Sequence, residues 1–263
     1  MDYDETEIAT TYDKARALAP ETLLLWQDLL SAHIDRAAIS LVIDLGCGTG
    51  RFSEVLAEHF GVHVIGIDPS EKMVDQARRK SATGNVDYRH GAAEALPLPD
   101  GCADLTFMSM VYHHFTDPTA VARECHRVLR RGGYACIRNG TRESDFPHRH
   151  FFPGLQALIA SDLPSRRDIQ SVFAVGGFTP VVHQVVTQVT AADWPSFIEK
   201  SVLRADSFLA RLSDDDFQQG MAALRTPGDA INHMWTTPSL QGVLQCLIRS
   251  LASICPACLC ART

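Results

Sequence analysis

Short apolar runs alternate with segments of helical periodicity along most of the chain. Runs rich in β-branched and other apolar residues are typical of buried strands, and the intervening segments repeat apolar residues three and four positions apart, as helices do. Strands that alternate with helices at this spacing predict an α/β fold, a doubly wound and mostly parallel sheet. The predicted strands cover residues 41–45, 62–67, 86–89, 103–111, 134–137 and 181–189, and the predicted helices include 118–131 and 165–175.

The pattern changes on either side of this core, which we place at residues 41–190. Residues 1–40 contain a predicted helix from Pro20 to about His33 and should form an N-terminal helical cap. From residue 191 the apolar positions recur at helical spacing, which predicts a helical insertion that forms a lid over the carboxyl edge of the sheet. Residues 231–263 show no two-residue alternation, so residues 191–263 are expected to end in an irregular C-terminal tail.

A glycine-rich turn follows the first predicted strand, in the stretch VIDLGCGTG at 42–50. Gly46, Gly48 and Gly50 lack a Cβ atom, so the backbone can adopt positive φ and a ligand can approach it closely. The second predicted strand ends at Asp68, 18 residues after Gly50. A carboxylate there can accept hydrogen bonds from the vicinal hydroxyls of a ribose. The pair predicts a nucleoside-binding site at the carboxyl edge of the sheet.

Charge and composition favour a small-molecule partner. The chain has 24 Lys and Arg against 31 Asp and Glu, a formal net charge of −7. This argues against nucleic acid as the main partner, because binding a phosphate backbone needs clustered cations. The acidic N-terminal stretch has no apolar signal region, and no stretch approaches the roughly 18 apolar residues that span a bilayer, so we expect no membrane and a cytoplasmic location.

The eight cysteines do not indicate a metal centre. Three of them lie in the C-terminal CPACLC, where soft ligands could hold a thiophilic metal. A closed zinc site needs four ligands, and only His233 is a further candidate, so we predict no metal site. The CPACLC cysteines are Cys255, Cys258 and Cys260, and the single cysteines interpreted as thiols are Cys47, Cys102, Cys125 and Cys136.

Four motifs in series resemble those of class I S-adenosylmethionine-dependent methyltransferases, in particular the small-molecule enzymes called type 11 or ubiquinone-biosynthesis-like. The resemblance extends over residues 40–190 or thereabouts, and the motifs occur in the order and spacing typical of that family. It implies a Rossmann-like sheet of seven strands with the last antiparallel. The motifs are VIDLGCGTG at 42–50, VIGIDPSEKM at 64–73, GAAEALPLPDGCADLTFMSMVYHHF at 91–115 and RECHRVLRRGGYACI at 123–137.

The resemblance also implies positions that bind S-adenosylmethionine. Gly46, Cys47 and Gly48 would pass under its methionine part, and Asp68 would hold the ribose hydroxyls. The other implied contacts are Asp44 to the loop or the amino group, Pro69 and Met73 against the adenine, Ala92 and Ala93 at its edge, the Ser109 carbonyl near the ammonium, and Tyr12 with Arg16 over the carboxylate. Many relatives have Asp or Ser at the position of Ala92.

Methyl transfer from a sulfonium is an in-line displacement, so catalysis consists mainly of alignment and exclusion of water. A base helps when the nucleophile carries a proton, and His113 or His114, after the fourth predicted strand, is placed for that role or for shaping the pocket. The residues FPHRHFF at 146–152 and the helix around Trp194 would either wall an aromatic pocket or form the core of the lid. The accepting atom stays open.

Two other functions share these features. A nicotinamide oxidoreductase also has a glycine turn and an acidic residue, but Gly-x-Gly-x-Gly lacks the later glycine of the dinucleotide pattern. A non-catalytic protein of the same fold would bind S-adenosylmethionine or S-adenosylhomocysteine without transferring the methyl group. The sequence favours an active methyltransferase on a small-molecule acceptor.

Overall fold

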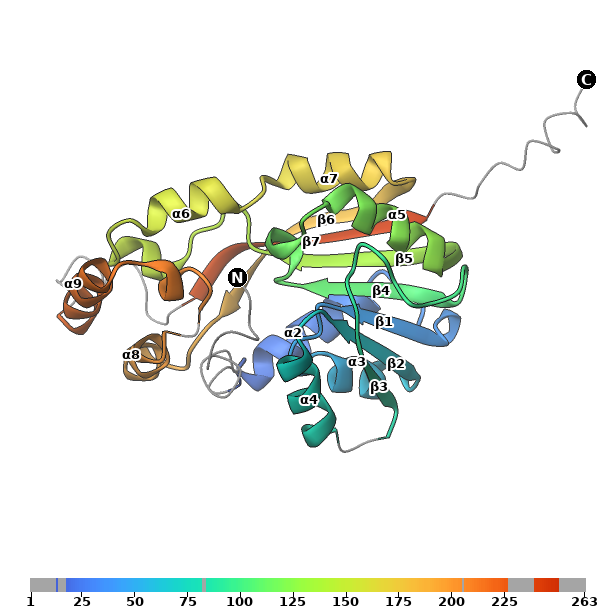
Figure 1. Cartoon of the computed structure of the whole chain (residues 1–263), viewed down its shortest axis with the longest axis horizontal. Coiled ribbons are helices and arrows are strands. Elements are labelled where there is room, and N and C mark those ends of the chain that lie inside the picture. The colour runs from blue at the N-terminus through green and yellow to red at the C-terminus, as the bar shows by residue number, and fades with distance from the viewer. Residues whose placement is uncertain (1–12, 14–17, 82–83, 205, 227–238, 251–263) are drawn as a thin grey trace, which may run out of the picture.

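A seven-stranded sheet organises the part of the chain that the structure, a computed structural model, describes: residues 13, 18–81, 84–204, 206–226 and 239–250 (Figure 1). The strand order is β3-β2-β1-β4-β5-β7-β6. All neighbouring pairs up to β5 are parallel, and β7 lies antiparallel between β5 and β6. The strands are β1 (Leu41–Leu45), β2 (His63–Asp68), β3 (Val86–His90), β4 (Ala103–Ser109), β5 (Leu129–Asn139), β6 (Phe178–Val189) and β7 (Ser239–Ser250).

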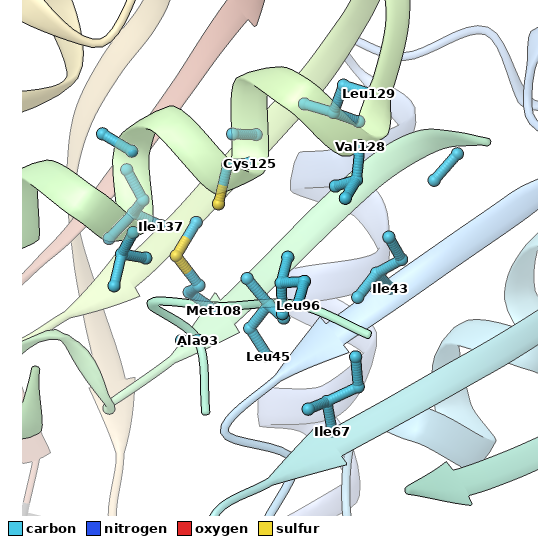
Figure 2. Close-up of a cluster of buried hydrophobic side chains, with 14 of the residues drawn as sticks. Ile43, Leu45, Ile67, Ala93, Leu96, Met108, Cys125, Val128, Leu129 and Ile137 are labelled. Carbon is cyan, nitrogen blue, oxygen red and sulfur yellow. The ribbon is translucent and has the colours of Figure 1, made fainter. Parts of the chain in front are cut away.

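Helices cover both faces of this sheet, so the prediction of a Rossmann-like, doubly wound fold is confirmed. Successive strand residues point to opposite faces, as Val42 and Ile43 do. Val42 packs with α2 (Pro20–Ser31) and α3 (Ser53–Phe60), whereas Ile43 belongs to the cluster under α5 (Pro118–Val128) and α7 (Arg166–Val175). Figure 2 shows this second cluster, in which Cys125 and Val128 of α5 lie over the strands. The helix α4 (Glu71–Lys80) packs on β2 and β3.

Three further helices pack around a hydrophobic core of their own, and we call this group the lid. They are α6 (Leu155–Asp162), α8 (Trp194–Val202) and α9 (Asp214–Arg225), and Figure 1 shows them grouped beyond one edge of the sheet. The lid joins one helix from the predicted core, α6, to two helices from the segment predicted as a lid. Aromatic side chains such as Phe152, Phe197 and Phe217 fill the space between them. The residue before α9, Ser213, caps the helix, because its hydroxyl accepts from the Asp216 N–H. The short 3₁₀ helices are η1 (Arg36–Ala38), η2 (Tyr112–His114), η3 (Pro147–His150) and η4 (Leu209–Arg211).

The structure corrects two sequence-based predictions. The C-terminal segment is not irregular throughout, because β7 is a regular strand of 12 residues that pairs with β5 and β6. The core sheet therefore includes a strand beyond residue 190. The helix predicted to reach Arg131 ends at Val128, since Leu129 already pairs with Ala103 in the sheet. Among the described residues, the structure has no helix with the length and apolar character that crossing a membrane requires.

Candidate functional site

The glycine turn connects β1 to α3 at the carboxyl edge of the sheet. Gly46, Gly48 and Gly50 all have positive φ, at 66°, 54° and 79°. The Gly46 N–H donates to the carbonyl oxygen of Ile67 at 2.7 Å, which holds the turn against the end of β2. This backbone path is available to glycine at little cost, whereas most residues with a Cβ avoid it.

The three glycines differ in what surrounds them. A Cβ atom at Gly46 would lie 2.2 Å from Cγ2 of Val111, and one at Gly50 would lie 2.3 Å from the hydroxyl of Tyr88. Both positions are therefore filled by the protein itself. Among the described residues, and apart from Gly48 itself and its two chain neighbours, no atom would lie within 4 Å of a Cβ atom at Gly48. The turn thus borders open space at Gly48, where a ligand can approach the backbone.

The carboxylate of Asp68 lies next to the turn. Its Oδ2 accepts from the Gly48 N–H at 2.8 Å, and its Oδ1 accepts from the Ser70 N–H at 2.9 Å. The side chain is 8% exposed, so it is held between backbone donors at the rim of the sheet. A carboxylate offers about four acceptor positions, so this bonding is compatible with further donors such as ribose hydroxyls.

Asp44 lies deeper, at the base of the turn. Its Oδ2 accepts from the Ser53 hydroxyl at 2.7 Å, which ties the end of β1 to the first residue of α3. Burial raises the pKa of Asp44 to about 7, the nearby charge of Asp68 adds to this, and the Ser53 hydrogen bond and Arg51 oppose it. The Asp44 carboxyl therefore changes charge in the neutral pH range.

Other predicted binding residues lie around the same rim. Pro69 and Ala92 are exposed, whereas Met73 and Ala93 are buried. The Gly91 N–H donates to the backbone oxygen of Asp68 at 3.1 Å, so the segment that follows β3 lies beside the end of β2. Tyr12 and Arg16 are outside the described residues. Between them, the Asp13 carboxylate accepts from the Thr49 hydroxyl of the turn and pairs with Lys80 at 2.7 Å.

The single cysteines are thiols, as predicted. Burial raises the pKa of the Cys47 thiol well above its usual range, and the charges of Asp44 and Asp68 add to the shift. Cys47 is therefore suited to packing in the turn and not to nucleophilic chemistry. The described residues contain no group of three or more His, Cys, Asp or Glu side chains that could hold a metal ion. CPACLC and His233 fall outside the described residues.

A pocket of about 110 Å³ lies between the carboxyl edge of the sheet and the lid. It meets the turn at Arg51, the residue after Gly50, and the end of β4 at Met110. Its walls combine aromatic rings with charged and polar side chains. Besides Arg51 and Met110, they include His113, Arg138, Phe146, His148, Gln188, Phe197, Lys200, Ser201, Asp206 and Phe208.

The aromatic segment predicted either to wall a pocket or to fill the lid does both. Phe146 and His148 line the pocket. Phe151, Phe152 and Trp194 belong to the core of the lid.

His113 lines this pocket, whereas His114 is not among the lining residues. The His113 ring stacks on Phe208 of the lid, with centroids 5.9 Å apart and planes at 22°. The centroids of the two histidine rings are 4.1 Å apart. Of the two histidines considered as a base, the structure therefore places only His113 at the pocket wall.

A second histidine, His148, also lies in the pocket wall. Its Nε2 is 2.9 Å from the Ser201 hydroxyl oxygen, and that hydroxyl donates to the Phe197 carbonyl at 2.7 Å. Its ring stacks on Phe197, with centroids 4.5 Å apart and planes at 29°. Sequence analysis placed His148 only in an aromatic segment and missed this arrangement.

Sequence analysis also missed Arg138, the largest polar side chain in the buried core of the sheet. The residue is 1% exposed, and its guanidinium carbon lies 4.9 and 5.2 Å from the ring centroids of Trp26 and Phe52. Its Nη1 donates to the Ser109 hydroxyl at 2.8 Å and its Nη2 to Oε1 of Gln188 at 2.6 Å. The signal in the sequence is an arginine directly after the apolar run YACI.

Comparisons with known proteins agree with this geometry. Residues 43–137 match the family model described as a methyltransferase domain. This range begins in β1 and ends in β5, so it includes the turn and Asp68. Residues 43–137 of this chain thus form a methyltransferase domain.

Two curated relatives extend the similarity of this methyltransferase domain. An uncharacterized 37.1 kDa protein in transposon TN4556 of Streptomyces fradiae is 38% identical over 235 residues, which cover 82% of this chain and 65% of that protein. The chain thus spans a little under two thirds of that relative. The 27-O-demethylrifamycin SV methyltransferase of Amycolatopsis mediterranei is 27% identical over 201 residues, 72% of each chain.

Solved structures show the same fold. The cyclase SpnF superposes with a TM-score of 0.61 at 20% identity, over 91% of this chain and 85% of its own. Other structures with this fold hold S-adenosylmethionine or S-adenosylhomocysteine. The family match also separates this chain from nicotinamide oxidoreductases, the other class with a glycine turn and an acidic residue.

Replacing single glycines of the turn should separate binding from folding. Gly48→Ala adds a Cβ atom on the open side and imposes backbone strain of about 1–2 kcal/mol, so it should weaken S-adenosylhomocysteine binding about tenfold while the protein stays folded. Gly50→Ala is the matched control. Its added Cβ atom must displace Tyr88, so it should lower the free energy of unfolding by about 1–3 kcal/mol more than Gly48→Ala does. Calorimetry and urea unfolding measure the two effects. Equal losses of stability with unchanged affinity in Gly48→Ala would contradict this assignment.

The raised pKa of Asp44 predicts a pH dependence of stability. A carboxyl whose pKa rises from 3.8 to about 7 on folding stabilises the folded state fully below pH 3.8, and this contribution is lost as the pH rises through 7. Relative to Asp44→Asn, the free energy of unfolding of the unmodified protein should fall by about 2–4 kcal/mol between pH 4 and pH 7. Urea unfolding of both proteins at each pH measures the difference, and a constant difference over this range would refute the shift.

Proposed function

We propose that this protein transfers the methyl group of S-adenosylmethionine to a small-molecule acceptor bound in the pocket under the lid. One observation carries the proposal. Arg51 directly follows the glycine turn and also lines the pocket, so a cofactor on the turn and an acceptor in the pocket would be neighbours. The name of the Amycolatopsis relative, which is that of a methyltransferase for a rifamycin, supports a small-molecule acceptor.

Each part of the cofactor has suitable residues at the rim. In this proposal Asp68 accepts hydrogen bonds from the ribose hydroxyls, and its two backbone bonds keep the carboxylate in place. Open space at Gly48 admits the methionine part along Gly46, Cys47 and Gly48. Its ammonium would lie toward the Asp44 carboxylate and the Ser109 carbonyl. Pro69 and Met73 would flank the adenine, with the backbone of Ala92 and Ala93 at its edge, and Tyr12 and Arg16 would close over the carboxylate.

When bound, the cofactor supplies an electrophilic methyl group on a positively charged sulfur. The protein's task is to hold the acceptor atom in line with that methyl group and to exclude water. The lid serves the second task, because Phe197 and Phe208 bring apolar rings to the pocket from its far side. His113 is placed to accept a proton from an acceptor that carries one.

The second candidate is a protein of this fold that binds S-adenosylmethionine or S-adenosylhomocysteine without transferring the methyl group. The solved structure of SpnF, which shares this fold over most of both chains, is named as a cyclase, so the fold also occurs in a protein named for an activity other than methyl transfer. Fold alone does not establish methyl transfer. Production of S-adenosylhomocysteine distinguishes the two functions.

Removing the carboxylate of Asp68 should weaken cofactor binding. Asp68→Ala removes the charged acceptor for the ribose hydroxyls, so S-adenosylhomocysteine should bind about 1.5–3 kcal/mol less tightly by calorimetry. Asp87→Ala is the matched control, because it removes an exposed carboxylate from the neighbouring strand β3. Circular dichroism checks that both variants fold. An unchanged dissociation constant in Asp68→Ala would refute the role of Asp68.

The activity itself is tested by incubating the full chain with S-adenosylmethionine and a metabolite extract. We expect S-adenosylhomocysteine to accumulate with time and enzyme concentration, and Asp68→Ala to slow its formation at least tenfold when the cofactor is limiting. Tight cofactor binding without product from any extract would instead support the non-catalytic role.

A further inference from the structure

The charge of the pocket is opposite to that of the whole protein. The chain has a formal net charge of −7, yet the described residues of the pocket wall include Arg51, Arg138 and Lys200 and a single carboxylate, Asp206. Arg51 lies on the side of the glycine turn, so we count its charge with the cofactor side of the site and not with the acceptor side. Arg138 and Lys200 still outweigh Asp206 in the remaining wall. A cationic pocket in an acidic protein attracts anions selectively.

The two remaining cations are fixed along the same stretch of chain. Nη2 of Arg138 donates to the side chain of Gln188, and Nζ of Lys200 donates to the backbone oxygen of Thr190 at 2.9 Å. Positions 188 and 190 lie two residues apart at the end of β6, about 7 Å along an extended chain. One cation comes from the sheet and the other from the lid helix α8. Both therefore flank the acceptor side of the pocket.

The position of Arg138 is set by several groups at once. The rings of Trp26 and Phe52 lie against its guanidinium, and the Trp26 N–H donates to the same Gln188 oxygen at 3.0 Å. A planar guanidinium held in this way is already ordered before a ligand binds, so little side-chain entropy remains to be lost. Phe146 and Phe208 supply apolar walls next to these charges.

We propose that the acceptor is an acidic small molecule, with a flat apolar body and a carboxylate or phosphate group that binds next to Lys200 and is also attracted by the buried charge of Arg138. The aromatic walls would hold the body, and the paired cations would fix the orientation of the acidic group. That the bound anion is the methyl acceptor rests on the proposed function. Binding of an anion at this site can be measured without methyl transfer.

Benzoate and benzamide form a matched pair of probes, because they differ mainly in charge. Ligand-observed NMR titrations of the full chain, with and without saturating S-adenosylhomocysteine, should show benzoate binding about tenfold more tightly than benzamide. Phenyl phosphate is the third probe, and its affinity relative to benzoate shows which acidic group the site prefers. Equal or tighter binding of benzamide, or no binding of benzoate, would overturn the proposal.

Variants assign the preference to the pocket. Lys200→Met keeps the apolar stem and should weaken benzoate about three- to tenfold while leaving benzamide unchanged. Asp206→Asn keeps an oxygen that accepts from the Phe208 N–H and should strengthen benzoate. Lys72→Met, on the exposed side of α4, is the control for charge removal and should change neither probe. A benzoate preference that Lys200→Met leaves intact would also refute the site.

The two proposals fail in different ways. If S-adenosylhomocysteine does not bind in calorimetry, the proposed function is wrong, while a benzoate preference that Lys200→Met abolishes would still establish the anion site. If S-adenosylhomocysteine binds and its production is detected, but the protein binds benzoate no more tightly than benzamide, only the proposal of an acidic acceptor is wrong.

Discussion

The hydrogen bond from the Gly48 N–H to the Asp68 carboxylate joins the two elements on which the site depends. Gly48 belongs to the turn after β1 and Asp68 to the end of β2, and the bond is 2.8 Å long. The two residues can meet because β1 and β2 are parallel neighbours, with Leu45 opposite Ile67. Parallel strands end at the same edge, so the sheet itself brings a backbone donor and a carboxylate together there.

Much of this arrangement could be predicted, because its causes are local in the sequence. The apolar run of β1, the three glycines and the placement of Asp68 are all contained in 28 residues, from Leu41 to Asp68. The glycine conformation follows from the residue type, and the strand ends follow from the apolar runs. Core helices such as α7 could also be predicted because their signals are local. The α7 helix begins after Ser165, whose side chain caps it by accepting from a backbone N–H three residues later.

The parts that sequence analysis missed depend on distant contacts. The strand β7 pairs with β5 and β6 on its two sides, and the residues it meets at 134–139 are more than a hundred positions earlier in the chain. Its own sequence lacks the alternation that marks a half-buried strand, because an interior strand need not have it. The early end of α5 has the same origin, since pairing of Leu129 with Ala103 overrides the helical pattern.

The residues of the pocket could not be predicted from the sequence for a related reason. Arg138, Gln188 and Lys200 come from β5, β6 and α8, and Trp26 of α2 completes the arrangement. No spacing rule links these four residues. Only the folded sheet brings the first two within hydrogen-bonding distance across β7, and only the lid brings Lys200 to the same wall. The residues proposed for the cofactor thus lie mostly within one series of sequence motifs. The residues of the acceptor side come from distant segments that only the tertiary structure brings together.

The central claim is that the turn and Asp68 hold an adenosyl cofactor with its sulfur directed at the pocket. A crystal structure of the full chain with S-adenosylhomocysteine tests it most directly. The account predicts both ribose hydroxyls within hydrogen-bonding distance of the Asp68 carboxylate and the sulfur facing the wall formed by Met110 and His113. A ribose that makes no contact with Asp68, or a sulfur turned away from that wall, would contradict it.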